Sequence, residues 1–364
     1  MWFIILGTAF AAAVAGVIYL TVTVSKFGFL RALAGERIRL PYLISFIVLA
    51  AAFGLVARVM SVVNAVVVFL HVVLFFLLVG CILRIVRCFS GKDYSVGLQG
   101  LLAVALSVIY LAAGYYLLHH VWQTDYSLQT DKPVNLKIAL FADSHLSTTF
   151  DGDGFAEHMK TIDAQKPDIV LIPGDFVDDW SKKADMLKAC DALGKMDAKY
   201  GVWYAYGNHD AGFFNNRDFT AAELEQALLD NGIHVLSDDY ELVDDRFYVA
   251  GRKDSSLGPR KTMDELLDGV DPNKYIIVLD HEPNDYDNEA ASAADLVVSG
   301  HTHGGQLIPI TYVGEWFGIN DSTYGHENRN GTDFIVTSGI SDWEIQFKTG
   351  TKSEYVIIEI SQRQ

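Results

Sequence analysis

The chain has 364 residues, of which 51% are hydrophobic, and a formal net charge of −17. This length allows two domains, and the charges divide unevenly between two regions. Residues 1–120 hold eight basic and two acidic residues, whereas residues 121–364 hold 20 basic and 43 acidic ones. The C-terminal region is therefore strongly acidic and repels polyanions, which disfavours nucleic acid as a partner and a nuclease as the function.

Four apolar stretches in the first 120 residues are each long enough to cross about 30 Å of hydrocarbon as a helix. They cover residues 2–24, 40–57, 62–83 and 98–118. The first is not preceded by the basic residues of a cleaved signal peptide. These stretches predict a four-helix transmembrane anchor over residues 1–120.

The positive charges of this region lie mainly in its first and third connections. They are Lys26, Arg31, Arg37 and Arg39 in the first, and Arg84, Arg87 and Lys92 in the third. Because basic loops stay in the cytoplasm, both termini are expected outside. We therefore expect a multi-pass protein of the cell membrane with an extracytoplasmic C-terminal domain. Arg58, in the second connection, is an exception, and an odd number of spans would reverse the orientation.

Residues 121–135 are polar and contain Lys132-Pro133, which predicts an exposed linker. From residue 136 to 364, apolar strand-like runs alternate with helical patterns, which is typical of an α/β fold with helices on both faces of a sheet. Strands are expected at 136–142, 168–172, 202–206, 247–251, 275–280, 296–299, 334–338 and 355–360, and helices around 154–165, 182–196, 221–231, 263–267 and 286–293.

Five polar motifs each follow directly after a strand-like run. They are Asp143-Ser144-His145, Gly174-Asp175-Phe176-Val177-Asp178, Gly207-Asn208-His209-Asp210, His281-Glu282-Pro283 and Gly300-His301-Thr302-His303-Gly304-Gly305. Proteins of the α/β class bind ligands at the carboxyl ends of their strands, where such loops converge. Oxygen and nitrogen ligands without thiolates favour Mn, Fe or Zn over a calcium site.

Two divalent cations in such a site would leave it positively charged. Asp143 and Asp175 are the two strongest carboxylate candidates, and together they offset half of the four positive charges. With a bridging hydroxide, about one positive charge remains, which attracts a phosphate group into an otherwise acidic domain. The motifs therefore predict a two-metal site that hydrolyses a phosphoester substrate.

In this order, the five motifs resemble those of the calcineurin-like metallophosphoesterase superfamily: D-x-H, G-D-x-x-D, G-N-H-[DE], a single His and G-H-x-H. They extend from Asp143 to His303, and residues 300–306 look like the bacterial branch of membrane-anchored YkuE- and YaeI-type phosphodiesterases. The resemblance implies a metallophosphoesterase-type β-sandwich flanked by helices over residues 136–364.

The resemblance also implies a role for each motif residue. Asp143, His145 and His303 would bind the first metal, Asn208, His281 and His301 the second, and Asp175 both. His209 would be no ligand but the general acid for the leaving oxygen, or a group that stabilises the transition state. The nucleophile would be a hydroxide held by the metals. Asp178 and Asp210 would orient the ligands.

The sequence leaves open the identity of the substrate and the role of the aromatic residues near the last motif. Membrane attachment favours a lipid-linked or envelope substrate, and the resemblance favours a phosphodiester or pyrophosphate bond. The alternative is a membrane sensor or receptor whose metal domain binds a phosphorylated ligand without turnover, although the complete ligand set and His209 favour an enzyme. Trp316, Phe317 and Tyr324 either contact an apolar substrate or pack locally. His158, His234 and His326 lie outside the motifs and are expected at the surface.

Overall fold

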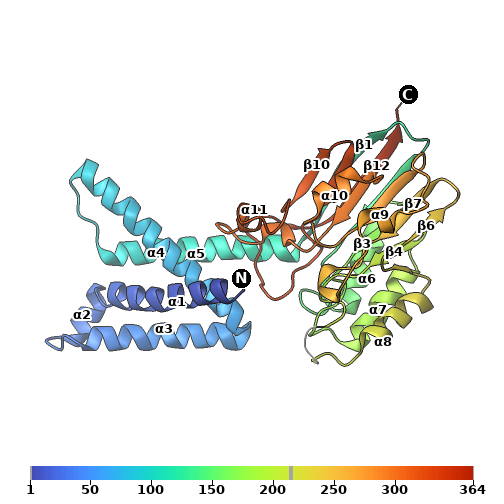
Figure 1. Ribbon diagram of the computed structural model, residues 1–364. Helices are drawn as coiled ribbons and strands as arrows, with labels where there is room; N and C mark the ends of the chain where they lie inside the picture. Colours follow the sequence, from blue (N-terminus) through green and yellow to red (C-terminus); the bar gives the residue numbers. More distant parts are fainter. Residues whose placement is uncertain (1, 213–215, 364) are drawn as a thin grey trace. The chain divides into compact units, whose positions relative to one another are not determined.

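The computed structural model describes residues 2–212 and 216–363, and its contacts divide the chain into two compact units (Figure 1). The first unit comprises Met1–Tyr115 and Glu344–Gln346, and the second comprises Tyr116–Trp343 and Phe347–Gln364. Almost all of the apolar N-terminal region thus separates from the acidic region that carries the motifs.

The first unit is built from helices. They are α1 (Trp2–Val24), α2 (Gly28–Ala34), α3 (Leu40–Val59), α4 (Val62–Ser90) and most of α5 (Val96–His119). Helices α3, α4 and α5 are each long and apolar enough to span a membrane. A fourth span exists only if Ala11–Val24 and α2, which are bent by 73° from one another, cross as one broken segment. The structure thus contains apolar helices at all four expected stretches, three of which qualify as membrane spans by themselves, and α1 has the bounds of the first expected stretch, residues 2–24.

Local sequence sets the ends of α4, the longest helix. The hydroxyl of Ser61 accepts a hydrogen bond from the backbone of Asn64 at its start, and Gly91 ends it in the left-handed conformation. The Asn64 side chain donates to the Glu344 carbonyl (3.0 Å) and accepts from the Gln346 amide (2.8 Å). These bonds account for the membership of Glu344–Gln346 in the first unit.

The second unit contains two six-stranded mixed sheets. The strand order of the first is β1-β12-β2-β3-β4-β5, and that of the second is β10-β11-β9-β8-β7-β6. The first sheet contains β1 (Val121–Thr130), β2 (Leu136–Leu140), β3 (Ile169–Pro173), β4 (Val202–Ala205), β5 (His234–Leu236) and β12 (Ser353–Gln362). The second contains β6 (Asp239–Val243), β7 (Phe247–Gly251), β8 (Tyr275–Leu279), β9 (Leu296–Ser299), β10 (Gly325–Arg329) and β11 (Thr332–Val336).

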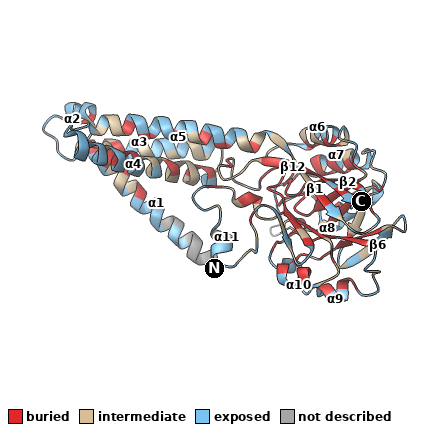
Figure 2. Cartoon of the chain, turned by 90° about the horizontal axis from the view of Figure 1, so that it is seen from above, coloured by how far each residue is buried: buried red, intermediate tan, exposed pale blue. Residues whose placement is uncertain are grey.

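The two sheets pack against each other and carry helices on their outer faces. One apolar core combines residues of β2, β3, β4 and β12 with residues of β7, β8, β9 and β11 and so lies between the sheets. A second core packs α6 (Gly152–Asp163), α7 (Lys183–Gly194) and α8 (Ala221–Asp230) on the first sheet. A third packs α9 (Met263–Leu266) and α10 (Tyr286–Ala291) on the second. The strands are accordingly the most buried part of this unit (Figure 2). The α/β class is confirmed, but each sheet has helices on one face only.

Residues 121–130, expected in a linker, form strand β1 instead. β1 pairs with β12 in parallel over its whole length, from Val121 opposite Ser353 to Thr130 opposite Gln362. Because β1 is at the edge of the sheet, nine of its ten residues are half-buried or exposed, and its composition is correspondingly polar. The last apolar helix ends at His119, so a single residue connects it to the sheet.

Strands β5, β6 and β10 were not predicted from the sequence either. These strands are short and lie at or next to the edges of their sheets, where alternating polar side chains hide the apolar pattern. β10 carries His326, which was expected at the surface and contacts Asp333 at 2.9 Å.

The topology brings the carboxyl ends of six strands to one edge of the sandwich. β2, β3 and β4 are mutually parallel in the first sheet, and β8, β9 and β11 are mutually parallel in the second. The five motifs and the segment after β11 follow these strands directly, so the fold gathers them at this edge.

We predict that the buried ion network behind this edge is needed for stability. Arg252 is buried and contacts Asp280 (2.9 Å), Asp285 (2.7 Å) and Glu289 (3.5 Å). Arg252→Met would leave these carboxylates buried without the positive charge of Arg252 and should lower the unfolding free energy by about 3–5 kcal/mol.

Urea unfolding of the full chain in detergent, followed by tryptophan fluorescence, measures this change, because five of the six tryptophans lie in the second unit. Arg363→Met removes an exposed arginine paired with Asp131 and is the matched control, for which little change is expected. Equal midpoints for the two variants would contradict the prediction.

Candidate metal centre

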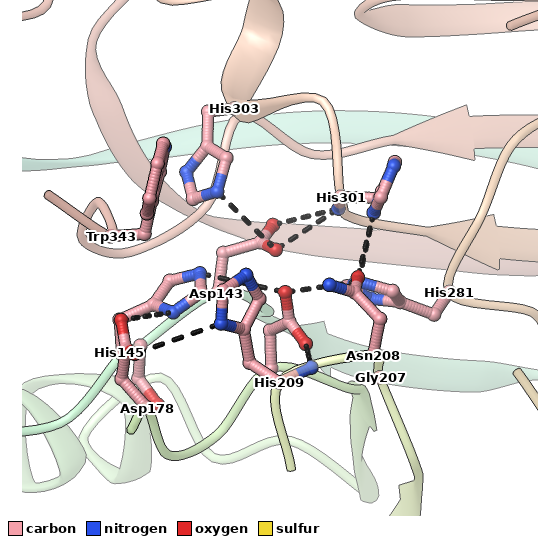
Figure 3. A network of polar contacts seen from close by, with 12 residues as sticks. Asp143, His145, Asp178, Gly207, Asn208, His209, His281, His301, His303 and Trp343 are labelled. Atoms are coloured by element: carbon pink, nitrogen blue, oxygen red, sulfur yellow. Dashed lines mark hydrogen bonds and ion pairs between the residues drawn. The ribbon is translucent and has the colours of Figure 1, made fainter. Parts of the chain in front are cut away.

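The predicted site residues lie together at the common edge of the two sheets (Figure 3). Loops after β2, β3 and β4 supply Asp143, His145, Asp175, Asn208 and His209, and loops after β8 and β9 supply His281, His301 and His303. Within the described residues, three groups have donor atoms close enough to hold a metal: Asp143–His145–His303, Asp175–His281–His301 and His145–Asp178–His209.

The donors predicted for the second metal surround one point. Oδ1 of Asn208 lies 3.1 Å from Nε2 of His281 and 3.0 Å from Nδ1 of His301, and these two nitrogens are 3.3 Å apart. Ligands with bonds of about 2.1 Å to one cation lie about 3.0–3.4 Å from each other in octahedral or tetrahedral geometry. Nδ1 of His281 is 2.8 Å from the Pro173 carbonyl, which can only accept, so the N–H is on Nδ1 and Nε2 is left to bind a metal.

The donors predicted for the first metal are arranged more loosely. Nε2 of His303 is 3.9 Å from Oδ1 of Asp143, and the rings of His145 and His303 are stacked 5.1 Å apart. Nδ1 of His145 faces Asp178 at 3.3 Å, so that its Nε2 points into the group. Although His145 is fully buried, neither of its ring nitrogens makes a well-aligned hydrogen bond within the described residues. Such an imidazole is costly to bury unless it binds a cation.

Asp175 connects the two groups. Its Oδ2 lies 3.5 Å from Nε2 of His145 and 3.1 Å from Nε2 of His281, one donor from each predicted metal. Its other oxygen accepts the backbone amide of His209 at 2.9 Å. The side chain therefore has the position that a carboxylate bridging two cations requires.

The backbone at the site is unusual. Asp143, His145, Asp175, His301 and His303 all have positive φ, between 35° and 69°. This region is sparsely populated by residues other than glycine, and such conformations persist only where surrounding structure enforces them. Five of the seven predicted ligands have this strained backbone, whereas it is uncommon in the rest of the described chain. Strain concentrated in this way is typical of a functional site.

Two glycines let the loops approach one another. Gly174 has φ of 86°, and a Cβ on it would lie 2.8 Å from Nδ1 of His281. A Cβ on Gly207 would overlap the carboxylate and backbone amide of Asp175. Neither position accommodates a side chain without moving a predicted ligand.

Asp210 and Asp178 orient these residues, as predicted. Asp210 is fully buried and accepts the amides of Asp175 (2.8 Å), Val177 (3.0 Å) and Gly207 (2.8 Å), so it holds two ligand loops together. Asp178 contacts Nδ1 of His145 with one oxygen, and its other oxygen is 3.6 Å from Nδ1 of His209.

Burial and charge shift the pKa values of these side chains in opposite directions. Burial alone would lower the pKa of His145, but contact with Asp178 and the charges of Asp175 and Asp143 raise it to about 9. Burial alone would raise the pKa of Asp175, but His281 and His145 hold it well below its usual range. Burial raises the pKa of Asp143. Burial instead lowers the pKa of His301 and His303, which leaves these two imidazoles neutral and able to bind a cation, whereas a cation must displace a proton from His145.

A sixth loop at the site, which follows β11, was not predicted from the sequence. Oδ1 of Asp342 lies 3.3 Å from Nδ1 of His303, and the Trp343 ring lies 6.1 Å from that of His209. The ammonium of fully buried Lys348 donates to the carbonyls of Ser338, Gly339 and Ser341 around Asp342. Like the five motifs, this loop follows a strand that was predicted, so the strand-end rule alone would have found it.

Comparison with known proteins places the chain in a family. Residues 136–305 match the model of the calcineurin-like phosphoesterases. An uncharacterized metallophosphoesterase of Aquifex aeolicus is 34% identical over 197 residues, which cover 51% of this chain and 71% of the relative. The chain belongs to the calcineurin-like phosphoesterase family.

Two further relatives extend the match. A transmembrane protein with metallophosphoesterase domain from Danio rerio is 27% identical over 322 residues, 80% of this chain and 71% of the relative. The uncharacterized metallophosphoesterase YkuE of Bacillus subtilis is 26% identical over 229 residues, 60% of this chain and 78% of the relative. This phosphoesterase is thus a metal-dependent enzyme by family and is similar to relatives that include a transmembrane protein.

We predict that Gly207→Ala weakens metal binding by the phosphoesterase, because the new methyl group displaces Asp175 from between the two groups. Metal content after reconstitution with Mn²⁺, measured by mass spectrometry on the full chain, should fall by at least half. Gly54→Ala is the control, since a Cβ at Gly54 meets nothing within 4 Å. Full metal loading of Gly207→Ala would show that Asp175 does not need its present position.

Metal affinity should rise with pH. The raised pKa of His145 stabilises the metal-free fold fully below pH 6.5, and this contribution is lost as the pH rises through about 9. Since a cation must displace that proton, Mn²⁺ binding should release protons and tighten between pH 7 and pH 9 by up to about tenfold per unit. Titration calorimetry in buffers of different ionisation enthalpy measures the release. An affinity independent of pH in this range would contradict the prediction.

Proposed function

We propose that the phosphoesterase hydrolyses a phosphodiester or pyrophosphate bond with two divalent cations, Mn, Fe or Zn. Asp143, His145 and His303 would hold one cation and Asn208, His281 and His301 the other, with Asp175 shared. When bound, the cations would activate the nucleophile and neutralise charge on the phosphate. The observation that carries the proposal is the contact of a single Asp175 oxygen with one histidine of each group.

His209 is proposed as the general acid. Its backbone amide is anchored on Asp175 and its Nδ1 faces Asp178, so Nε2 is the nitrogen that would meet the leaving oxygen. His209, Asn208 and His301 are only half-buried, whereas His145 and His281 are fully buried. The substrate would therefore arrive from the side of His209. Asp178 would orient the His209 ring through its contact with Nδ1 and would not itself take part in the reaction.

A substrate in the membrane or cell envelope is proposed from the chain's own composition. At least three apolar helices precede the second unit, which we call the catalytic unit because it carries the site. One residue separates the last of these helices from β1. Catalysis is thus tethered within a short distance of a bilayer, where lipid-linked phosphoesters are concentrated. Arg84, Arg87 and Lys92 lie at the connection between α4 and α5, and a cytoplasmic position of this connection would put the unit that follows α5 outside, whether three or four helices cross the membrane.

Hydrolysis of a panel of substrates tests the proposal. We expect Mn²⁺-dependent turnover of an aryl phosphodiester and a lipid pyrophosphate by the full chain in detergent, with lower activity on an aryl monoester. His209→Ala should reduce kcat by about 10²–10⁴-fold while metal loading is retained. Asp175→Asn should reduce both activity and metal loading.

His326→Ala serves as the matched histidine control, because His326 lies on β10 outside the site. Metal binding without hydrolysis of any substrate would overturn the proposal in favour of a membrane sensor. Unchanged activity of both His209→Ala and Asp175→Asn would overturn the assignment of the site.

A further inference from the structure

A ridge of exposed apolar side chains follows the last metal motif. We define it as residues 308–317, whose large side chains Ile308, Ile310, Tyr312, Trp316 and Phe317 are all exposed. Trp316 and Phe317 are 71% and 75% exposed. The sequence left two alternatives open for these aromatic residues, and their exposure excludes the second, which was local packing. Residues 304–320 contain a single charged residue, Glu315, in a strongly acidic region.

The base of the ridge is held firmly in the catalytic unit. The amides of Thr349 and Gly350 donate to the Gln306 carbonyl at 2.8 and 3.0 Å, and the Ile308 amide donates to the Thr349 hydroxyl at 3.0 Å. At its other end the Asp321 amide donates to the Pro283 carbonyl at 2.8 Å. Leu307 is buried between these anchors and the exposed residues. The exposed side chains thus project from a fixed base three residues after the predicted ligand His303.

The same edge of the sandwich receives the end of the last apolar helix. β12 is antiparallel to β2, and β1 is parallel to β12, so β1 starts at the edge where β2, β3 and β4 end. Val121, the first residue of β1, is opposite Ser353 and is two residues after the end of α5. The chain therefore leaves the apolar helix at the catalytic edge and not at the opposite one.

Aromatic residues mark this point of exit, and contacts connect it to the ridge. The rings of Tyr116 and His120 are stacked, and that of Trp122 packs edge-on against His120. Such amphipathic rings are enriched where a span leaves the hydrocarbon. The Lys352 ammonium lies 5.6 Å from the centre of the Trp122 ring. Lys352 is two residues after Gly350, on which the base of the ridge is hydrogen-bonded.

We infer that residues 308–317 insert into the headgroup region of the bilayer that contains the chain's own apolar helices, and that they present the catalytic edge to lipid-borne phosphoesters. The bilayer is the fitting partner because the ridge is uncharged but for Glu315, rich in Trp, Tyr and Ile, and connected through Thr349–Lys352 to the residues at the end of α5. For its catalytic consequence, this inference rests on the proposed function.

The position of the ridge is tested without any measurement of activity. In the full chain with Cys81→Ser and Cys88→Ser, Phe317→Cys is labelled with bimane, and the protein is placed in nanodiscs; Cys190 is buried and is retained. Doxyl-labelled phosphatidylcholine should quench this bimane at least twofold more than an aqueous nickel chelate does. Leu229→Cys is the matched control: it is an exposed leucine near the end of α8, at the opposite edge, and should show the reverse preference.

Two results would overturn the inference. One is quenching of position 317 by the aqueous nickel chelate to the same extent as position 229. The other is shielding of position 317 from both quenchers, which would mean that protein, including a second copy of the chain, covers the ridge.

The catalytic consequence is tested by comparing two substrates of the same chemistry. For Trp316→Ser/Phe317→Ser, the ratio of kcat/KM for an acylated nitrophenyl phosphodiester in the nanodisc to kcat/KM for soluble bis(nitrophenyl) phosphate should fall at least tenfold. For Leu187→Ser/Leu229→Ser the ratio should stay within twofold. An unchanged ratio in the ridge variant overturns the lipid preference. Absence of hydrolysis of both substrates and of the lipid pyrophosphate by the unaltered chain overturns the proposed function, and the quenching result then still decides where the ridge lies.

Discussion

The catalytic unit depends on a buried carboxylate, Asp175, placed where the two sheets meet. Its oxygen lies against a histidine that follows a strand of the first sheet and another that follows a strand of the second. Unpaired burial of that charge would be strongly unfavourable, and two histidines and the backbone amide of His209 contact it. The positive φ angles of five predicted ligands and the absence of side chains at Gly174 and Gly207 are consequences of bringing six loops so close to it.

The arrangement of the strands determines what else lies at this edge. Four parallel strands in each sheet direct their carboxyl ends to one side, and β12 and β1 run the opposite way in the first sheet. The loop between β11 and β12 lies at this edge and brings Asp342 to His303, and the beginning of β1 brings the residues after the last apolar helix to the same edge. A topology with β1 reversed would have put the apolar helix and the site at opposite edges.

Much of the site follows from the sequence because its chemistry is local to strand ends. Each of the five motifs follows a strand whose apolar run is continuous, since both faces of the central strands are buried. The donors predicted for the second metal, Asn208, His281 and His301, lie together with Asp175, and those predicted for the first also form a group. Asp342 and Lys348 were missed because neither stands in a recognised motif, although Asp342 follows a predicted strand.

The elements that were not predicted share a physical cause. β1, β5, β6 and β10 lie at or near sheet edges, where polar side chains face solvent and the register comes from a partner strand distant in sequence. The Gln123, Asp125 and Ser127 side chains of β1 give it the composition of a linker, and only pairing with β12 makes it a strand.

The charge distribution explains why contact with lipid would be apolar here. Residues 121–364 carry an excess of 23 acidic residues, which an anionic lipid surface repels over a Debye length of about 8 Å at physiological salt. Basic side chains near the site would pair with its carboxylates and would therefore compete with metal cations for these carboxylates. Exposed Trp, Phe, Tyr and Ile side chains instead gain free energy from burial at the interface without any charge and independently of salt. In this chain the ridge and the predicted ligands His301 and His303 belong to one continuous segment, so contact with the bilayer and contact with the phosphate are positioned by the same loop.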